Sequence, residues 1–448
     1  MGSKEKKLRL SVFGIGKLGC TMLACFAHKG WHVIGMDINR EFVDTLNRGR
    51  SPIYEPGVDD LIKANRERVT ATLDVKEAVM NSDVSFVIVP TPSIEDGSFS
   101  TKYVEAVAAE IGSILRGKDT YHLVVITSTV LPGDMHDIVR LLEKTSGKKC
   151  QRDFGVCYNP DFIALGTVVY NFMNPDMVLI GESDPAAGEM LEGIHRQLVD
   201  NRPSIHRMNF YNAELTKISI NSYCTLKITF ANTLAEICEK IPGGDVDAVT
   251  SALGADVRIG PKYIKGGLSY GGPCFPRDNR AFSHSAARYG IRTPLAETTD
   301  ALNNYHRNQR IPDFLENIIL ERKTECISVL GLTYKKDTTL VEESAALYIV
   351  RALAKKGIRI KVYDPAGMPE AREALRDYNN IEYTESAMSC IEGTGVCFLA
   401  TPWDEFRAIT KEDFLKAMKT PVIFDAWNFY PFRDEEGFEY REIGKYVV

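Results

Sequence analysis

The sequence predicts an α/β protein with two doubly wound parallel-sheet domains, joined by a helical central region that contains a long helix. The first observation is an alternation of short buried strands with helical stretches in the first part of the chain. The second is the stretch Asn212–Lys240, which has helical composition and contains neither Gly nor Pro. The third is the return of strand–helix alternation after residue 326. These patterns divide the chain into domains at residues 8–203, 204–305 and 306–448.

The composition is that of an ordinary globular protein, with 44% apolar and 25% charged residues. A net charge of -6 gives no reason to expect a nucleic-acid partner or an anionic membrane surface. Ten cysteines are scattered without a Cys-x-x-Cys pair, which argues against a zinc site and a disulfide framework and favours a reducing cytosol. No apolar run approaches the length of a membrane span, and the short charged start is not a signal peptide. We therefore expect a cytoplasmic protein that needs no metal.

The first predicted strand leads into a glycine-rich turn. The order is a strand at Leu8–Phe13, the motif Gly14-Ile15-Gly16-Lys17-Leu18-Gly19, a helical stretch at Cys20–Lys29, and a second strand at His32–Met36 that ends in Asp37. In such a motif Gly14 permits the tight turn, Gly16 lets the backbone approach a pyrophosphate, and Gly19 lets helix and strand pack closely. The phosphates would lie at a helix N-terminus, and Asp37 would hold the ribose hydroxyls and repel a 2′-phosphate. The pattern predicts a Rossmann-like site for NAD rather than NADP.

Polar segments follow several of the later strands. Buried strands are predicted at Val84–Val89, Leu123–Thr127, Phe154–Cys157 and Met177–Ile180, with helical stretches such as Thr101–Leu115 and Gly133–Lys144 between some of them. Ligands of a parallel sheet bind at the carboxyl ends of its strands. Three segments occupy those ends: Pro90-Thr91-Pro92, Ser128-Thr129 and Asn159-Pro160-Asp161. Each alone is more often an ordinary loop, but three on one rim favour a binding site.

The long central helix carries Lys217 and Asn221, which are four residues apart and hence on one face. A lysine on a helix is usually solvated, but apolar residues surround this pair, so we expect Lys217 to be partly enclosed. The segment Val257–Gly267 then supplies Arg258, Lys262 and Lys265. These cations fit either anion binding or a solvated face.

A single cysteine lies in the segment Gly271-Gly272-Pro273-Cys274-Phe275-Pro276-Arg277-Asp278. Glycines let backbone approach a ligand, and prolines stiffen the turn that holds the thiol. The cation at Arg277 favours thiolate, the nucleophilic form of Cys274. Taken alone, the segment is more typical of a surface turn with a small buried cysteine, and the rest of the chain is what favours the functional interpretation.

The last third predicts a second sheet that resembles the first. Cys326–Leu330 reads as a strand and meets Gly331-Leu332-Thr333-Tyr334-Lys335-Lys336-Asp337; a helix at Glu343–Lys356 follows, then strands at Arg359–Tyr363, Gly395–Ala400 and Pro421–Asp425. The second and third glycines of the first motif are missing here, so this domain should hold something other than a dinucleotide. Tyr334, Lys335 and Lys336 are candidates for phosphate binding. We predict that residues 437–448 form a loosely held tail.

Together these segments resemble the UDP-glucose/GDP-mannose dehydrogenase family over nearly the whole chain. The resemblance rests on the glycine motif, Ser128-Thr129-Val130, Asn159-Pro160-Asp161-Phe162, Lys217 with Asn221, Arg258-Ile259-Gly260, Gly271 to Asp278, and Gly331 to Asp337. It implies an NAD-dependent nucleotide-sugar 6-dehydrogenase, most simply one that acts on UDP-glucose, with a role in polysaccharide biosynthesis. Members of the family oxidise a sugar primary alcohol to a carboxylate with two NAD⁺, through an enzyme thioester.

The resemblance also implies catalytic roles. Cys274 would be the nucleophile, and Lys217 would stabilise negative charge on the substrate oxygen. Asn221 would share that task, and Asp278 would assist near the lysine and the thiol. Independently of the resemblance, a thiol is needed only if an aldehyde is oxidised further, and a fixed cation and amide suit the oxyanions formed on the way.

The other candidate residues would place water, cofactor and substrate. The resemblance implies that Thr129 and Asp161 place or activate water, with the general base left open. Candidate cofactor-binding residues are Gly14, Ile15, Gly16, Lys17, Leu18, Gly19, Asp37, Pro90, Thr91 and Thr129. Candidate substrate-binding residues are Asp161, Phe162, Leu165, Lys217, Asn221, Arg258, Tyr263, Lys265, Tyr270, Gly271, Tyr334 and Lys335. Arg258 would reach the sugar in a neighbouring subunit, which implies a homodimer built around the central helix.

Three residues depart from the family pattern. Leu165 stands where many relatives have a second glutamate, Glu342 where an arginine commonly precedes Glu-Ser, and Trp427 where relatives often have an arginine. The first change leaves the sugar open, and the others leave open how charge on the cofactor and the phosphates is neutralised. Two alternatives remain: a two-electron dehydrogenase of small β-hydroxyacids, and a nucleotide-sugar-binding regulator with little turnover. The first gives no role to the Cys274 segment or to a second sheet.

Overall fold

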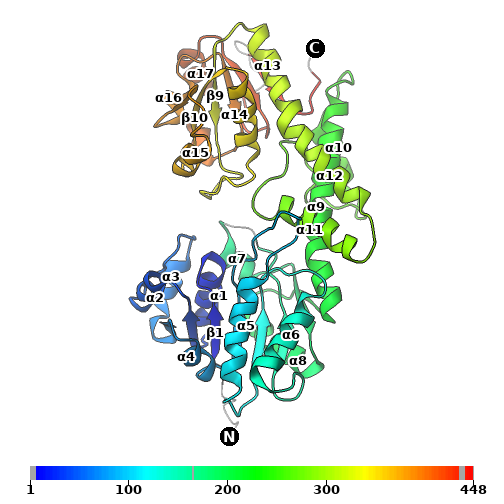
Figure 1. The fold of residues 1–448 in the computed structure, drawn as a ribbon. Helices are drawn as coiled ribbons and strands as arrows, with labels where there is room; N and C mark the ends of the chain where they lie inside the picture. The colour runs from blue at the N-terminus through cyan, green and yellow to red at the C-terminus, as the bar shows by residue number, and fades with distance from the viewer. Residues whose placement is uncertain (1–6, 164–165, 433–438, 447–448) are drawn as a thin grey trace. The chain divides into compact units, whose positions relative to one another are not determined.

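The computed structural model describes residues 7–163, 166–432 and 439–446. It divides into two compact units, residues 1–218 and 219–448 (Figure 1). The helix α9 (Phe210–Cys238) begins in the first unit and continues in the second. This confirms the long helix that the stretch without Gly or Pro predicts.

In the described residues of the first unit, eight strands form one sheet in the order β3-β2-β1-β4-β5-β6-β7-β8. The strands are β1 (Leu10–Phe13), β2 (Val33–Met36), β3 (Val69–Thr72), β4 (Val84–Val87), β5 (Leu123–Ile126), β6 (Gly155–Tyr158), β7 (Met177–Glu182) and β8 (Ser204–Met208). Neighbours pair in parallel except β6 and β7, which are antiparallel. The connection between those two contains only the short helix α7 (Val168–Met173), whereas a parallel crossover usually contains a longer one. Because β8 pairs with β7, the first sheet extends past residue 203, the predicted end of the first domain.

Helices cover both faces of this sheet. Successive residues of a strand point to opposite faces, so they pack in two different apolar layers. Leu10 and Val12 of β1 pack in one layer and Phe13 in the other. The first layer includes residues of α1 (Lys17–His28), α2 (Arg40–Asn47), α3 (Val58–Ala64), α7 and α8 (Pro185–Leu198). The second includes residues of α4 (Val75–Met80), α5 (Lys102–Leu115) and α6 (Asp134–Ser146). The sheet is therefore doubly wound.

The second unit begins with a helical region around the rest of α9. Its elements are α10 (Val246–Ala255), α11 (Phe275–Arg288), α12 (Pro294–Tyr305), a π-helical turn (His306–Arg310) and α13 (Ile311–Glu321). Asn279 on α11 and Asn303 on α12 are almost fully buried. Among the residues that the structure describes, no helix is long and apolar enough to span a bilayer.

The second sheet has six described strands, all parallel, in the order β11-β10-β9-β12-β13-β14. Figure 1 labels β9 and β10 of this sheet. They are β9 (Cys326–Leu330), β10 (Arg359–Tyr363), β11 (Ile381–Tyr383), β12 (Val396–Leu399), β13 (Val422–Asp425) and β14 (Glu439–Glu442). The helices are α14 (Ala345–Lys355), α15 (Met368–Ala374), α16 (Ala387–Ile391) and α17 (Lys411–Ala417). Apolar layers lie on both faces here too, so both predicted sheet domains are confirmed.

The prediction of a loose C-terminal tail is wrong for the described residues 439–446. Four of them form β14, which pairs with β13, and Ile443 is buried. The Tyr446 N–H donates to the Gly244 carbonyl at 3.0 Å, and Lys445 forms an ion pair with Asp245 at 2.6 Å. All these partners are far away in the chain, so the local pattern gives no sign of them.

Candidate functional site

The turn between β1 and α1 has the geometry of a dinucleotide-binding loop. Gly14 has a φ of +92°, and a Cβ added there would lie 2.3 Å from the Ile88 carbonyl oxygen. A Cβ on Gly19 would lie 1.8 Å from the Gly14 carbonyl oxygen, so this glycine lets α1 pack against the turn. At Gly16, by contrast, an added Cβ would meet no described atom within 4 Å beyond its chain neighbours. Because α1 has no side-chain cap and no acidic residue in its first turn, its N-terminus suits a pyrophosphate.

Asp37 follows β2 and is bound to that turn. Its Oδ2 accepts a hydrogen bond from the Ile15 N–H and its Oδ1 one from the Asn39 N–H, both at 2.8 Å. Each carboxylate oxygen can accept a second bond, so Asp37 is fixed in place and still able to accept from ribose hydroxyls. A 2′-phosphate would meet this negative charge. The loop and Asp37 therefore fit NAD.

The loops after β4 and β5 are joined at the same edge of the sheet. The Ser128 hydroxyl donates to the Val89 carbonyl and accepts from the Val89 N–H, both at 2.8 Å. These loops also carry Pro90, which is exposed, and the buried Thr91 and half-buried Thr129. The partners are 39 residues apart, so the sequence identifies Ser128 as part of a rim segment but not as the link between two loops.

Lys217 and Asp161 lie next to each other in the first unit. The Lys217 ammonium donates to the backbone carbonyl of Asp161 and lies 4.5 Å from the centre of the Phe162 ring. Lys217 is only 8% exposed, so it is enclosed, as its apolar neighbours predict. Desolvation raises the pKa of the Asp161 carboxyl to about 7, although the positive charge of Lys217 opposes the shift. Asp161 is thus able to give or take a proton near neutral pH.

The structure places Cys274 at the N-terminus of a helix, which the local sequence pattern does not predict. Cys274 is exposed and is the N-cap of α11, with Pro276 in the first turn. The free N–H groups of a helix N-terminus favour a thiolate. Burial lowers the pKa of the nearby Arg277, but the Asp278 carboxylate and the Cys274 sulfur raise it above its usual value. The predicted cation next to the thiol is therefore present.

Asp278 is fully buried and bound from two sides. Its Oδ1 accepts from Arg277 Nε at 2.9 Å, and its Oδ2 accepts from the side-chain amide of Asn221 at 2.5 Å. A buried carboxylate needs such partners, and these fix the orientation of the Asn221 amide. The second unit thus brings together Cys274, Asp278 and Asn221. Lys217 lies one helical turn before Asn221 along α9.

The Cys274 segment also packs against the loop that follows β9. A Cβ on Gly271 would lie 2.2 Å from the Glu343 carbonyl oxygen. Gly272 has a φ of +78°, and its added Cβ would lie 2.6 Å from ring atoms of Tyr334. The two glycines therefore allow the thiol segment to pack closely against the Glu343 backbone and the Tyr334 ring. The sequence predicts Tyr334 and Lys335 for the substrate but not the contact.

The loop after β9 cannot receive a dinucleotide as the first loop does. Asp364 holds the place in the second sheet that Asp37 holds in the first, but it is buried. Its Oδ2 accepts from the Leu332 N–H at 2.7 Å, from the Thr333 N–H and hydroxyl at 3.0 Å, and from Trp403 Nε1 at 3.1 Å. Its Oδ1 accepts from the Ala366 and Gly367 N–H groups, so no acceptor capacity remains there for a ribose. This agrees with the predicted binding of something else by the second sheet.

Two predicted basic residues are exposed. The Arg258 side chain is 84% exposed and forms an ion pair with Asp256 at 2.6 Å, within its own loop. Lys265 is also exposed. Both cations are therefore at the surface of this chain, where a ligand or another subunit could reach them.

The predicted aromatic residues surround Phe275, the neighbour of the thiol. The ring of Tyr263 lies edge-on to Phe275 at 5.7 Å between centres and is half exposed. The ring of Tyr270 lies 6.4 Å from Phe275 and is buried. The Tyr270 N–H donates to Asn303 Oδ1 at 2.9 Å, which ties this segment to α12.

The three departures from the family pattern have different surroundings. Leu165 lies outside the described residues. Glu342 is exposed. The Trp427 indole N–H donates to the Ala400 carbonyl at 2.9 Å, and its ring lies 3.3 Å from the position of an added Cβ on Gly267. Trp427 therefore fills space between the second sheet and the central region.

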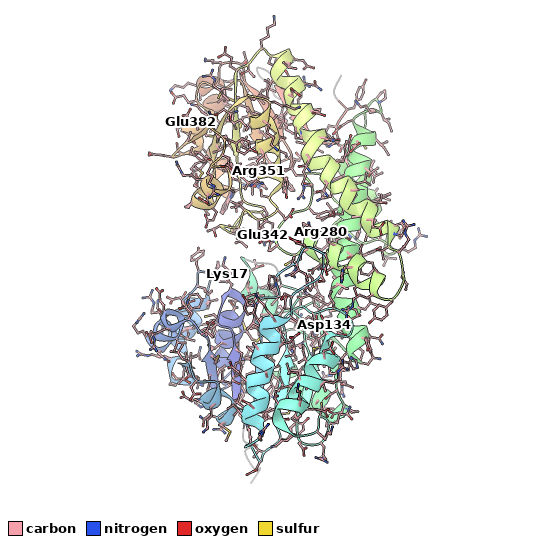
Figure 2. The ribbon with its side chains drawn as sticks, viewed as in Figure 1. Lys17, Asp134, Arg280, Glu342, Arg351 and Glu382 are labelled. Atoms are coloured by element: carbon pink, nitrogen blue, oxygen red, sulfur yellow. The ribbon has the colours of Figure 1, made fainter. Side chains whose placement is uncertain are left out.

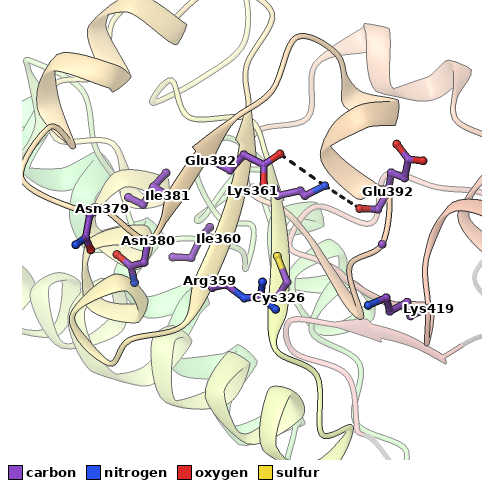
Figure 3. Close-up of a pocket in the computed structure, with 11 residues that line it drawn as sticks. Cys326, Arg359, Ile360, Lys361, Asn379, Asn380, Ile381, Glu382, Glu392 and Lys419 are labelled. Atoms are coloured by element: carbon purple, nitrogen blue, oxygen red, sulfur yellow. Dashed lines mark hydrogen bonds and ion pairs between the residues drawn. The ribbon is translucent and has the colours of Figure 1, made fainter.

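A pocket of about 350 Å³ lies at the amino ends of strands of the second sheet, away from the carboxyl ends of these strands (Figure 3). It is lined by residues at or near the amino ends of the strands: Cys326, Arg359, Ile360, Lys361, Asn379, Asn380, Ile381, Glu382, Glu392, Gly393 and Lys419. Arg359 is paired with Glu325 at 2.6 Å, and Lys361 donates to the Glu392 carbonyl at 2.9 Å. Parallel sheets bind ligands at the carboxyl ends of their strands, so this pocket is not the candidate site.

The described residues also contain no cluster of three His, Cys, Asp or Glu side chains suited to a metal.

Comparisons with known proteins agree with these observations. Sequence models of the UDP-glucose/GDP-mannose dehydrogenase family match residues 8–199 (NAD binding domain), 211–305 (central domain) and 328–431 (UDP binding domain). A UDP-glucose 6-dehydrogenase of Haloferax volcanii is 33% identical over 97% of this chain and 100% of its own. A GDP-mannose 6-dehydrogenase of Pseudomonas aeruginosa is 35% identical over 80% of this chain and 81% of its own. The structure of a UDP-glucose dehydrogenase from Pyrobaculum islandicum matches with a TM-score of 0.87 and 30% identity, over 99% of each chain.

Proposed function

The chain belongs to the UDP-glucose/GDP-mannose dehydrogenase family, and we propose that it oxidises the C6 hydroxymethyl group of a nucleotide sugar to a carboxylate. The simplest substrate is UDP-glucose, with UDP-glucuronate as the product. The observation that carries this proposal is the placement of Cys274 at the start of α11, beside the bound pair of Asp278 and Asn221. A two-electron reaction would have no use for such a thiol.

The first oxidation converts the alcohol to an aldehyde. NAD⁺ supplies the hydride acceptor for this step and for the second. Lys217 stabilises the negative charge on the substrate oxygen as the hydroxyl proton leaves, and Asn221 shares that task. Both side chains are held by other groups, Lys217 by the Asp161 carbonyl and Asn221 by Asp278, which supports a preorganised role.

The second oxidation passes through Cys274. Its sulfur adds to the aldehyde carbon and forms a C–S bond in a thiohemiacetal; loss of a second hydride gives a thioester. Water, placed by Thr129 and activated by Asp161, then attacks the thioester carbon. The C–S bond breaks, and the thiol and the carboxylate form. One alcohol, one water and two NAD⁺ thus yield one carboxylate, two NADH and three protons.

The nucleotide would lie along the loop after β9 and the Cys274 segment. Tyr334 and Lys335 would contact the nucleotide, together with Tyr263 and Lys265. The close packing of Gly272 on Tyr334 supports this, because it brings the nucleotide-binding residues near the thiol. Phe162, Leu165, Tyr270 and Gly271 would line the sugar.

We further propose a homodimer around α9, in which Arg258 reaches the sugar in the other subunit. Tyr223, Phe230 and Ile237 follow one another at seven-residue spacing on α9, with exposed fractions of 60%, 51% and 48%. Large apolar side chains repeated along one helix face usually meet a partner. The exposure of Arg258 supports its use outside its own chain.

A panel of UDP- and GDP-hexoses, with and without an N-acetyl group, tests the proposal by NADH formation. The expected result is two NADH per sugar consumed; one NADH would indicate the β-hydroxyacid type, and none with any sugar would indicate a binding regulator.

Leu165 cannot accept a hydrogen bond from a sugar hydroxyl, and losing such a partner costs about 1–3 kcal/mol. We therefore expect Leu165→Glu to change the ranking of sugars, and an unchanged ranking would exclude Leu165 as a selector.

A further inference from the structure

Glu343 connects the loop after β9 to the helix that begins at Cys274. Its carboxylate accepts from Arg280 Nη2 at 3.2 Å and from Arg307 Nη1 at 2.6 Å. Arg280 lies on α11, and Arg307 lies in the π-helical turn. Arg280 and Glu342, the neighbour of Glu343 in the chain, are labelled in Figure 2. A single carboxylate thus joins three segments of the second unit.

The Arg307 side of this junction is enclosed by the protein. Arg307 is only 5% exposed, and its guanidinium lies 3.8 Å from the centre of the Tyr348 ring. The Tyr348 hydroxyl donates to the same Glu343 carboxylate at 3.2 Å, and Arg307 Nη2 donates to Asn304 Oδ1 at 2.7 Å. The positive charges of Arg307 and Arg280 lower the pKa of Glu343, against the opposing effect of burial. The carboxylate is therefore ionised and held by charged donors.

The backbone of Glu343 adds a second connection. Its φ is +52°, a left-handed backbone conformation that residues other than glycine seldom adopt. In that conformation its carbonyl oxygen occupies the space where Gly271 lacks a Cβ. A strained residue persists when its surroundings determine its conformation, and such residues occur preferentially near functional sites. The side chain and the carbonyl of one residue thus contact α11 and the segment that leads to the thiol.

We propose that Glu343 is a positioning residue, which sets the register between the Cys274 segment and the Tyr334–Lys335 loop. This inference rests on the proposed function, in which the thiol and the nucleotide-binding loop act on one substrate. Glu343 touches neither substrate nor cofactor in this scheme. It acts through Arg280 and Arg307, and through its carbonyl at Gly271.

Glu343→Gln tests the proposal, because it keeps the shape of the side chain and removes its charge. The loss of hydrogen bonds between charged groups should raise KM for the nucleotide sugar about ten- to a hundredfold. Aldehyde should also escape before the second hydride transfer, so NADH per sugar falls below two. The Kd for NAD⁺ should stay within about twofold, because its predicted site lies in the first unit. Glu370→Gln, a charge removal at an exposed residue of α15, is the matched control and should leave all three values unchanged.

Two further variants separate positioning from folding. Glu343→Asn suits the left-handed backbone but is too short to reach Arg307. It should melt below the wild type because the buried Arg307 loses this partner, and the KM measured well below that melting temperature should still be raised. In a double-mutant cycle, Arg280→Met and Glu343→Gln should be markedly non-additive in kcat/KM, since both remove the same contact. Full additivity, or a wild-type KM and NADH yield in Glu343→Gln, would overturn the proposal.

Hydrogen–deuterium exchange gives a readout that does not depend on turnover. Glu343→Gln should speed exchange in peptides that cover residues 268–278 and 332–344, and Glu370→Gln should not. Unchanged exchange in Glu343→Gln would overturn the positioning role. If the wild type forms no NADH with any nucleotide sugar, the proposed function fails, while the exchange result still decides whether Glu343 couples these segments.

Discussion

Replacing Asp161 by asparagine removes a carboxyl whose pKa desolvation raises to about 7, and this should change the pH dependence of the reaction. If Asp161 activates water, activity requires its ionised form. With a pKa of about 7, the ionised fraction rises about tenfold between pH 6 and pH 8. The rate of carboxylate formation should follow that rise in the wild type. Asp161→Asn should lose both the rise and most of the rate.

The raised pKa of Asp161 should also make the free energy of unfolding fall with rising pH. The pKa of Asp161 is raised in the folded state, so the folded protein binds more protons than the unfolded chain between pH about 4 and about 7. The free energy of unfolding should therefore fall as pH rises through this window, by up to about 1.4 kcal/mol per pH unit. Asp161→Asn should remove this part of the fall.

The assay is a pH series of initial rates, together with denaturant unfolding at the same pH values. Asp119→Asn, at an exposed position in the same unit, is the control and should leave both curves unchanged. Lys217→Met removes the charge that opposes the shift, so it should move the rising limb of its residual activity to higher pH. If Asp161→Asn shows the same rise of initial rate with pH as the wild type, Asp161 is not the base that activates water.

Three other experiments test the roles of Asp37, Lys217 and Arg258. Asp37→Ala should narrow the preference for NAD⁺ over NADP⁺, measured as a ratio of kcat/KM values; equal values in the wild type would contradict the predicted role. Lys217→Ala should slow both oxidations, by about 10²–10³ in kcat, because charge develops on oxygen in each; a defect in one step alone would argue against it. Mixing inactive Arg258→Ala and inactive Cys274→Ala chains should restore some activity in heterodimers. No restoration would mean that each chain uses its own arginine.

The elements that could be predicted from the sequence are those with a strong local pattern. Leu123–Ile126 is a buried apolar run, and the stretch around Lys217 lacks Gly and Pro, so both formed as expected. The glycine turn was likewise predictable, because Gly14 and Gly19 each answer a steric need within the motif, while Gly16 leaves open space at the start of α1. Segments without such a pattern, such as β14, depend on partners distant in the chain and were missed.

In the candidate site, too, some features could be predicted from the sequence and others could not. The residue types near the thiol were predictable from one short segment and a family resemblance. Their arrangement was not: the helix start at Cys274, the bond from Asn221 to Asp278 and the junction at Glu343 all depend on tertiary contacts. Asn221 and Asp278 are 57 residues apart, and no periodicity connects residues over that distance.

The central claim is that carbon–sulfur chemistry at Cys274 carries the second oxidation, and the carboxylate yield of Cys274→Ala tests it most directly. The variant should bind NAD⁺ and the nucleotide sugar as the wild type does, since the thiol serves only the later half of the reaction. We predict slow release of aldehyde and no carboxylate, measured by mass spectrometry of the products. Formation of carboxylate by Cys274→Ala at the wild-type rate would contradict it.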